Sequence, residues 1–193
     1  MITPVVFDYK GRDRIVSGGS DGRLHLLDSE SVKTALHSTA ALSSGGGVWG
    51  GLSSWEDADG VRWVAAPVWG ALNPELKAPV ANGPAPNGSV VAFRVEEQGG
   101  KPVLTPVWVS RDLSSPVPPV ITSGVVFALS TGAKNKGRAT LYALDSATGK
   151  EMYSTGDQVT APANLTGLTL ANGRVFFTTA DSTLYAFGIF LEI

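Results

Sequence analysis

The ten residues from Leu141 to Lys150, LYALDSATGK, decide how the rest of the chain is interpreted. The first four, LYAL, suit a strand with one face on a core, because apolar side chains recur there with nearly the two-residue period of a strand. The remaining six supply turn chemistry, since Asp and Ser side chains bond the nearby backbone and Gly149 permits positive φ. Shorter versions of the phrase begin at Leu24 (LHLLDSES), Val90 (VVAFRVEE) and Leu184 (LYAFG). A unit repeated at intervals of roughly 40 to 60 residues indicates a repeat architecture.

Four units of short strands can be placed along the chain, and we expect each to be a four-stranded antiparallel blade of a β-propeller. The predicted fold is therefore all-β, a single partial β-propeller over residues 1–193 with about four blades. The blades are predicted at residues 1–42, 43–112, 113–160 and 161–193. In the first unit the fourth strand is predicted at Val32–His37, and in the second an insertion is predicted at Trp69–Ser89. The first strand of the last unit is predicted at Leu165–Leu170.

The predicted propeller is incomplete at both ends. The last unit has no outer strand, and the first unit begins directly with its innermost strand, so neither terminus completes the other. We therefore expect the chain to be part of a propeller, the C-terminal half of a larger one. A blade buries both of its faces against neighbours, and large apolar patches are rare on monomers. The expected partners are the remaining blades or a second copy of the chain, unless four blades close into a small ring.

Composition excludes several classes of protein. Hydrophobic residues make up 43% of the 193 residues, enough for a substantial core, and the net charge of −2 gives no reason to expect nucleic acid. There are no cysteines, which excludes disulfides and thiolate metal sites. No run of 18 apolar residues predicts a membrane span. The opening residues MITPVVFDYKGRDR lack the pattern of a secretory signal, and localisation stays open.

The pattern Ala143-x-Asp145-x-x-Thr148-Gly149-Lys150 resembles the blade signature of PQQ-type β-propeller repeats, the quinoprotein alcohol dehydrogenase-like group. The first unit, IVSGGSDGRLHLLD, also resembles a WD repeat, but later units lack the Trp-Asp ending. The resemblance to PQQ-type repeats implies a propeller, and it suggests a periplasmic or secreted protein. Catalytic members of that family hold PQQ over a tryptophan, with a catalytic Asp, a calcium ion and often a vicinal cysteine pair.

Fold resemblance does not carry this chemistry with it. The chain has no cysteine, and no Asn, Asp and Glu set matches the family's calcium ligands residue by residue. We therefore expect a non-catalytic binding or assembly scaffold for a protein or small ligand, with no cofactor in this chain. The alternative is the C-terminal part of a quinoprotein oxidoreductase whose active-site residues lie outside this chain. PQQ and calcium are expected only under that alternative.

Three tryptophans, Trp49, Trp55 and Trp69, are candidates for a platform that stacks a flat cofactor or a sugar. The competing interpretation is packing between blades, which the large area of an indole favours. The sequence alone favours packing.

Acidic and histidine side chains give weaker signals. Glu56, Asp57 and Asp59 resemble part of a calcium loop, but no downstream bidentate acid follows, so a hairpin turn is the better interpretation. His25 and His37 are expected on strand faces, without identifiable triad partners. The glycine runs at residues 18–19 and 45–47 are interpreted as turns. The sequence therefore predicts no catalytic, cofactor-binding or metal-binding residue.

Overall fold

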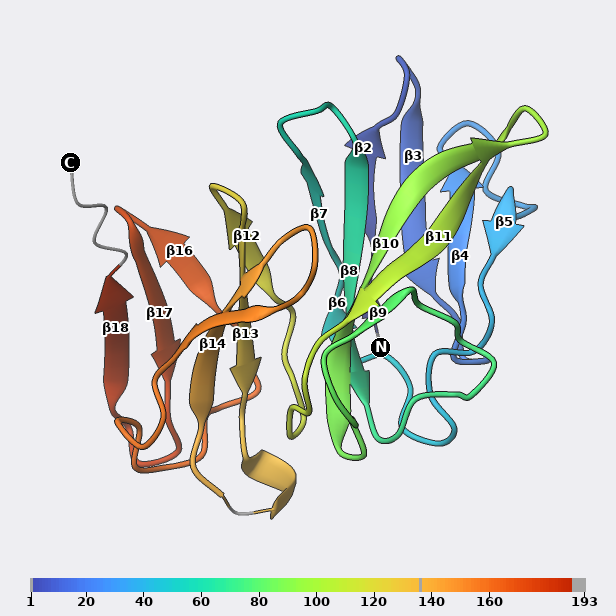
Figure 1. Ribbon diagram of the computed structural model, residues 1–193. Coiled ribbons are helices and arrows are strands. Elements are labelled where there is room, and N and C mark those ends of the chain that lie inside the picture. The colour runs from blue at the N-terminus through green and yellow to red at the C-terminus, as the bar shows by residue number, and fades with distance from the viewer. Residues whose placement is uncertain (1, 136, 189–193) are drawn as a thin grey trace.

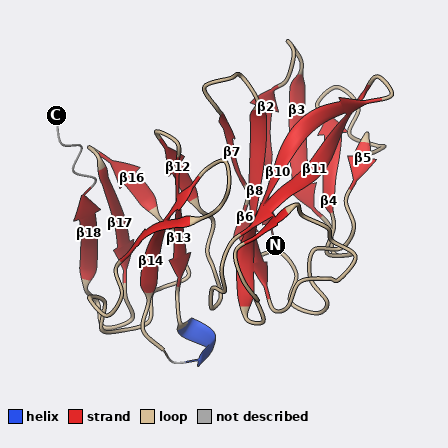
Figure 2. Ribbon diagram, viewed as in Figure 1, coloured by secondary structure: helices blue, strands red, loops and turns tan. Residues whose placement is uncertain are grey.

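A computed structural model describes residues 2–135 and 137–188, and these residues form an all-β structure (Figure 1). A single turn of 3-10 helix at Ala133–Asn135 is the one helical element described, as the colouring by secondary structure shows (Figure 2). Burial alternates with a two-residue period in strands such as Leu24–Asp28 and Arg174–Thr178, whereas the central strands Arg62–Trp69 and Val125–Ser130 are buried almost throughout, because both of their faces are covered. The prediction of an all-β chain is confirmed.

Blade 1 is the antiparallel sheet β2-β3-β4-β5, formed by β2 (Val5–Asp8), β3 (Asp13–Gly18), β4 (Leu24–Asp28) and β5 (His37–Ser38). The prediction of a fourth strand at Val32–His37 was wrong in its extent. The Asp28 carboxylate accepts the backbone N–H of Glu30, and the Asp28 carbonyl accepts that of Ser31. These bonds form a tight turn directly after β4, and only His37 and Ser38 pair with β4 as β5. The short β1 (Ile2–Thr3) pairs in parallel with β6 (Gly50–Gly51).

Blade 2 is the largest sheet, with order β7-β8-β10-β11-β9. Its strands are β7 (Ser53–Glu56), β8 (Arg62–Trp69), β10 (Gly88–Gln98), β11 (Lys101–Val109) and β9 (Val80–Ala81). The predicted insertion is shorter than expected, because Trp69 ends β8 and Ser89 already belongs to β10. The connection between these strands also contributes β9, which pairs in parallel with the C-terminal end of β11.

Blades 3 and 4 complete the row. Blade 3 contains β12 (Val120–Thr122), β13 (Val125–Ser130), β14 (Thr140–Asp145) and β15 (Glu151–Ser154). Blade 4 contains β16 (Thr169–Ala171), β17 (Arg174–Thr178) and β18 (Leu184–Gly188), three strands within the described residues. The first strand of blade 4 begins later than the predicted Leu165–Leu170, because Gly167 with a φ of 101° breaks the extended chain before it.

Three apolar clusters join consecutive blades and make a four-bladed β-propeller. One cluster combines residues of blades 1 and 2, a second those of blades 2 and 3, and a third those of blades 3 and 4. Within the described residues no cluster joins blade 4 to blade 1, and these two blades lie at opposite ends of the row in Figure 1. The four blades therefore form an open arc, in keeping with the predicted partial propeller.

The LYALDSATGK stretch forms β14 and its following turn, and the neighbouring blade explains its composition. Asp145 Oδ1 accepts the backbone N–H of Thr148 at 2.8 Å and its hydroxyl at 2.6 Å. The indole of Trp108, fully buried on β11, lies against Gly149 and donates its Nε1–H to the Ser146 carbonyl at 3.0 Å. The turn after β14 therefore also packs against the Trp108 side chain of the preceding blade.

A buried hydroxyl after the outer strand recurs in the first three blades. Thr39, Ser110 and Thr155 each accept the backbone N–H of the third strand, from Leu24, Val90 and Leu141 respectively, at 2.9–3.0 Å. Each also donates its own backbone N–H to the carbonyl of that same residue. We call these two hydrogen bonds the hydroxyl clamp. They end the pairing of the outer two strands in the same way in each of the three blades.

Candidate functional site

Trp49 and Trp69, two of the three proposed platform residues, lie against each other. Their ring centroids are 4.8 Å apart, and the ring planes are inclined by 23°. Trp69 Nε1–H donates to the Pro116 carbonyl at 2.8 Å, and Trp49 Nε1–H donates to that of Gly46 at 2.7 Å. Both indole donors are thus used within the protein. What the half-exposed Trp49 ring offers a ligand is its apolar surface.

The glycine run before Trp49 makes this arrangement possible. A Cβ at Gly46 would lie 1.8 Å from the Trp69 carbonyl oxygen, so only glycine lets the two segments approach this closely. The Ser43 hydroxyl bridges the same segments, because it donates to the Trp69 carbonyl and accepts the N–H of Gly46. The run is a turn, as the sequence suggested, and it also positions the tryptophan pair.

A pocket of about 190 Å³ lies beside the tryptophan pair, where segments leading into the inner strands of blades 2, 3 and 4 converge. Its lining contains no charged side chain and no side-chain hydroxyl or amide; it consists of Trp49, Gly50, Trp69, Pro116, Val117, Pro118 and Leu165. Pockets for drug-sized ligands measure about 300–1,000 Å³, so this one fits a single ring or small apolar side chain.

Trp55, the third candidate, lies elsewhere. It stacks on Trp63 of the neighbouring strand with ring centroids 5.5 Å apart, and it packs against the cluster between blades 2 and 3. Arg94 places its guanidinium 4.6 Å from the Trp63 ring centroid. Trp55 is therefore part of the packing between blades, whereas Trp49 and Trp69 are brought together at a surface pocket.

The acidic stretch before Gly60 forms a hairpin turn. Asp57 Oδ1 accepts the N–H groups of Asp59 and Val61, and Asp57 Oδ2 accepts Nε1–H of Trp63 at 2.7 Å. Partial burial alone would raise the pKa of Asp57, but the bonds from Trp63 and Val61 lower it below its usual value. The Asp57 carboxylate is thus engaged by the hairpin and by a neighbouring indole.

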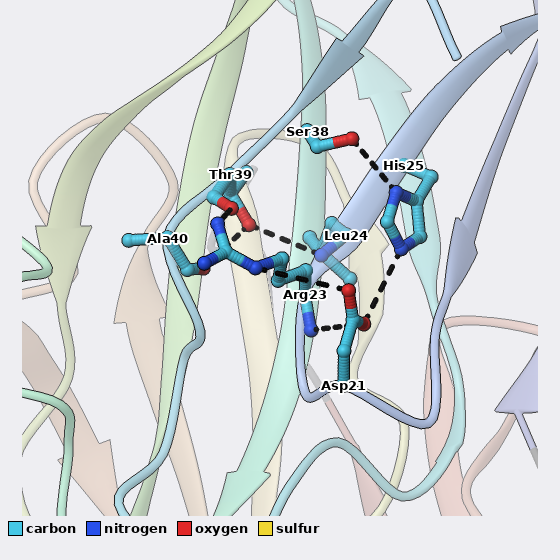
Figure 3. A network of polar contacts seen from close by, with 7 residues as sticks. All are labelled: Asp21, Arg23, Leu24, His25, Ser38, Thr39 and Ala40. Atoms are coloured by element: carbon cyan, nitrogen blue, oxygen red, sulfur yellow. Dashed lines mark hydrogen bonds and ion pairs between the residues drawn. The ribbon is translucent and has the colours of Figure 1, made fainter. Parts of the chain in front are cut away.

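The structure places His25 between two partners that sequence reasoning missed, Asp21 and Ser38 (Figure 3). His25 Nε2 lies 3.3 Å from Asp21 Oδ1, and His25 Nδ1 lies 2.8 Å from Ser38 Oγ. A carboxylate only accepts hydrogen bonds, so Nε2 carries a proton, and in the neutral ring Nδ1 accepts the Ser38 hydroxyl. The composition is that of a hydrolytic triad, with the two ring nitrogens in exchanged roles.

Blade 4 shows that Asp21 has a structural role in its turn. Asp21 Oδ1 accepts the N–H of Arg23, as Asp181 Oδ1 accepts that of Thr183 in the corresponding turn. Burial opposes the shift, but the bonds from Arg23 and His25 lower the pKa of Asp21 below its usual value. An aspartate three residues before the third strand of a blade, in the pattern Asp-x-x-Leu, was the available sequence signal.

The second half of the network in Figure 3 is the hydroxyl clamp of blade 1. Thr39 accepts the N–H of Leu24, and Arg23 donates to the Thr39 carbonyl at 2.7 Å. Since Ser110 and Thr155 make the same contacts in blades 2 and 3, the contacts of Thr39 are a structural feature of the blade. His37, the other histidine, accepts the N–H of Leu104 across the contact between blades 1 and 2 at 3.2 Å, and burial lowers its pKa.

Two further features bear on cofactors and membranes. Within residues 2–135 and 137–188, no three His, Cys, Asp or Glu side chains lie close enough together to hold a metal ion. The residues at the tryptophan pocket fit PQQ poorly, because this flat, anionic quinone would meet aromatic faces but no cation. No helix in the described part of the chain is long and apolar enough to cross a bilayer.

Comparisons with known proteins support the fold. No family model matches the chain, and no curated protein matches it. One similar solved structure is the crystal structure of the computationally designed Ika4 protein. The similarity covers 96% of this chain and 91% of that one, with a TM-score of 0.57 and 14% sequence identity. Identity this low shows a shared fold and carries no function.

Proposed function

We propose that the chain is a non-catalytic β-propeller scaffold that binds an extended peptide at the pocket beside Trp49 and Trp69. The observation that carries the proposal is the convergence of two stacked indoles and two prolines, Pro116 and Pro118, on one surface pocket. Aromatic-lined grooves of this chemistry bind proline-rich segments, whose preformed extended conformation reduces the entropy lost on binding.

The chemistry of the lining selects the ligand class. A sugar needs hydrogen-bond partners for its hydroxyls, but the lining side chains offer none beyond indole N–H groups that are already bonded. A proline ring or an aromatic side chain needs only apolar contact, and either matches the volume of about 190 Å³. We infer that the pocket holds one such side chain, with the flanking peptide lying over the surface.

A titration tests this proposal, with a decaproline peptide as the probe and intrinsic tryptophan fluorescence as the readout. We expect saturable binding that Trp49→Ala weakens at least about tenfold, since a buried aromatic contact contributes more than about 1.4 kcal/mol. Tyr153→Ala is the matched control, because Tyr153 is 47% exposed, close to the 45% of Trp49, but lies on β15 away from the pocket. Equal affinities for Trp49→Ala and Tyr153→Ala would disprove the assignment.

The quinoprotein alternative rests on the resemblance of residues 143–150 to PQQ-type repeats and stays a separate prediction. Adding PQQ with calcium to the purified chain tests whether this chain contributes residues to a quinone site. Calcium-dependent binding accompanied by a shift in the quinone absorbance would favour the oxidoreductase, and absence of both would favour the scaffold. Decaproline binding is measured independently, so the two outcomes can be distinguished.

A further inference from the structure

The two faces of each blade have different neighbours. The face toward the next blade along the chain is here called the front, and the face toward the preceding blade is called the rear. Front packs on rear at all three contacts in the arc. The front of blade 4 and the rear of blade 1 are therefore the two faces with no neighbouring blade among the described residues.

The front of blade 4 carries the residue pattern of a buried interface. The third strands of blades 1, 3 and 4 read LHLLD, LYALD and LYAFG, and the first leucine of each points to the front. Leu24 is 0% exposed and Leu141 is 1% exposed, whereas Leu184 is 64% exposed. Phe176 and Ala186 lie opposite each other on the same face of blade 4. The apolar pattern is preserved although no blade covers it.

The rear of blade 1 presents the complementary pattern. Val6, Ile15 and Leu27 face one another across three neighbouring strands and form one apolar row. The same row in blade 3 includes Val126 and Leu144, which are fully buried against blade 2. Val6 on the open rear of blade 1 is instead 58% exposed.

Charges at the adjoining row are also complementary. Arg174 lies on the front of blade 4 at the start of β17, two residues before Phe176 and in the neighbouring cross-strand row. Asp8 and Asp13 lie directly opposite each other on the rear of blade 1, where like charges destabilise a sheet. Neither aspartate nor Arg174 forms an ion pair within residues 2–135 and 137–188.

The contact between blades 1 and 2 shows that the corresponding front and rear rows face each other when two blades are packed together. There the front row contains Phe7, opposite Arg14, and the rear row contains Arg62, opposite Glu56. The Arg62 guanidinium lies 5.5 Å from the Phe7 ring centroid, so the two rows face each other. By the same register, Arg174 of one blade 4 would face the aspartate pair of an incoming blade 1.

We propose that the front of blade 4 binds the rear of blade 1 of a second copy of this chain, and that two copies close into one ring. Two arcs of four blades give eight, within the range of about four to eight blades found in propellers. The occupant is a second copy because both halves of the interface, matched in apolar rows and in charge, are present on the same chain.

The area of the faces explains why the ring must close. Three strands about 4.8 Å apart, with about five residues each at about 3.3 Å, give a face of roughly 240 Å². One front-on-rear contact buries about 480 Å², within the range of crystal-packing contacts. A closed pair makes this contact twice and buries about 960 Å², near the roughly 1,000 Å² of a specific interface. The two contacts therefore stabilise the pair only together.

Mass measurement across a concentration series, by sedimentation or light scattering, tests the proposal with matched variants. A chain of 20.0 kDa gives 40 kDa for the pair. We expect Leu184→Lys and Val6→Lys each to weaken pairing at least about 100-fold, because each places two unpaired charges in the closed ring. Met152→Lys and Val32→Lys are the controls, with exposures of 63% and 57% that match Leu184 and Val6 but positions outside both faces.

A charge exchange tests the register. Arg174→Glu and Asp13→Arg should each weaken pairing about tenfold or more, and the double variant should recover most of the loss, because the charges then attract in reversed order. Circular dichroism confirms that each variant keeps its β-structure. A wild-type monomer at every concentration, a pair that survives both Leu184→Lys and Val6→Lys, or masses that grow beyond two copies would each overturn the closed ring.

Discussion

Gly149 in the LYALDSATGK turn should tolerate a side chain poorly, and Gly149→Ala tests how blades 2 and 3 are joined. Its φ is 69°, a conformation that costs an alanine roughly 1–2 kcal/mol. A Cβ there would also lie 2.4 Å from Cε3 and 2.6 Å from Cδ2 of Trp108. The indole has no space to retreat into, because Trp108 is fully buried and its Nε1–H is bonded to the Ser146 carbonyl.

The expected cost has two parts. Overpacking a filled core by one methyl group costs about 1–3 kcal/mol, and this adds to the backbone strain of roughly 1–2 kcal/mol. Gly173→Ala supplies the control, since Gly173 has a similar φ of 66°, in the turn between β16 and β17, and no atom lies within 4 Å of the added Cβ. The difference between the two variants therefore isolates the packing of Trp108 against the turn.

Urea unfolding and thermal melts followed by tryptophan fluorescence measure both variants. The melting temperature should fall further for Gly149→Ala than for Gly173→Ala, by about 2–4 °C for each kcal/mol of additional cost in a chain of this size. Equal losses in melting temperature for the two variants would refute the reasoning, because they would show that the contact between Trp108 and residue 149 tolerates a methyl group. A smaller loss for Gly149→Ala in a Trp108→Leu background, where space is available, would support it independently.

Two further predictions concern stability. Thr155→Val should lower the unfolding free energy by about 1–3 kcal/mol in urea melts, because the buried N–H of Leu141 loses its acceptor; Thr155→Ser, which restores the hydroxyl used at Ser110, should recover most of it, and a fully stable Thr155→Val would contradict the clamp. Burial lowers the pKa of His37 in the folded state, so the unfolded state binds more protons as the pH falls. Stability should therefore decline as the pH drops below about 6.5, the ordinary histidine value, and His37→Gln should remove that part of the decline.

The candidate site was only partly predictable from sequence. The clustering of tryptophans drew attention to Trp49, Trp55 and Trp69, but residue spacing does not say which indoles meet. Trp55 lies on β7 and stacks on a neighbouring strand, whereas Trp49 and Trp69 meet because Gly46 lets two distant segments approach. The pairing of His25 with Ser38 was equally hidden, since it depends on where β5 begins.

The sequence by itself determined the repeating all-β architecture and the positions of most turns. These are local properties, set by a two-residue alternation and by residues such as Asp145 and Gly149 that stabilise particular turns. Tertiary structure decided which face of each blade is front and which is rear. Both faces of a blade are apolar, so alternation alone cannot distinguish them. Only the packed contacts show that Leu184 and Val6 occupy positions that are buried in other blades.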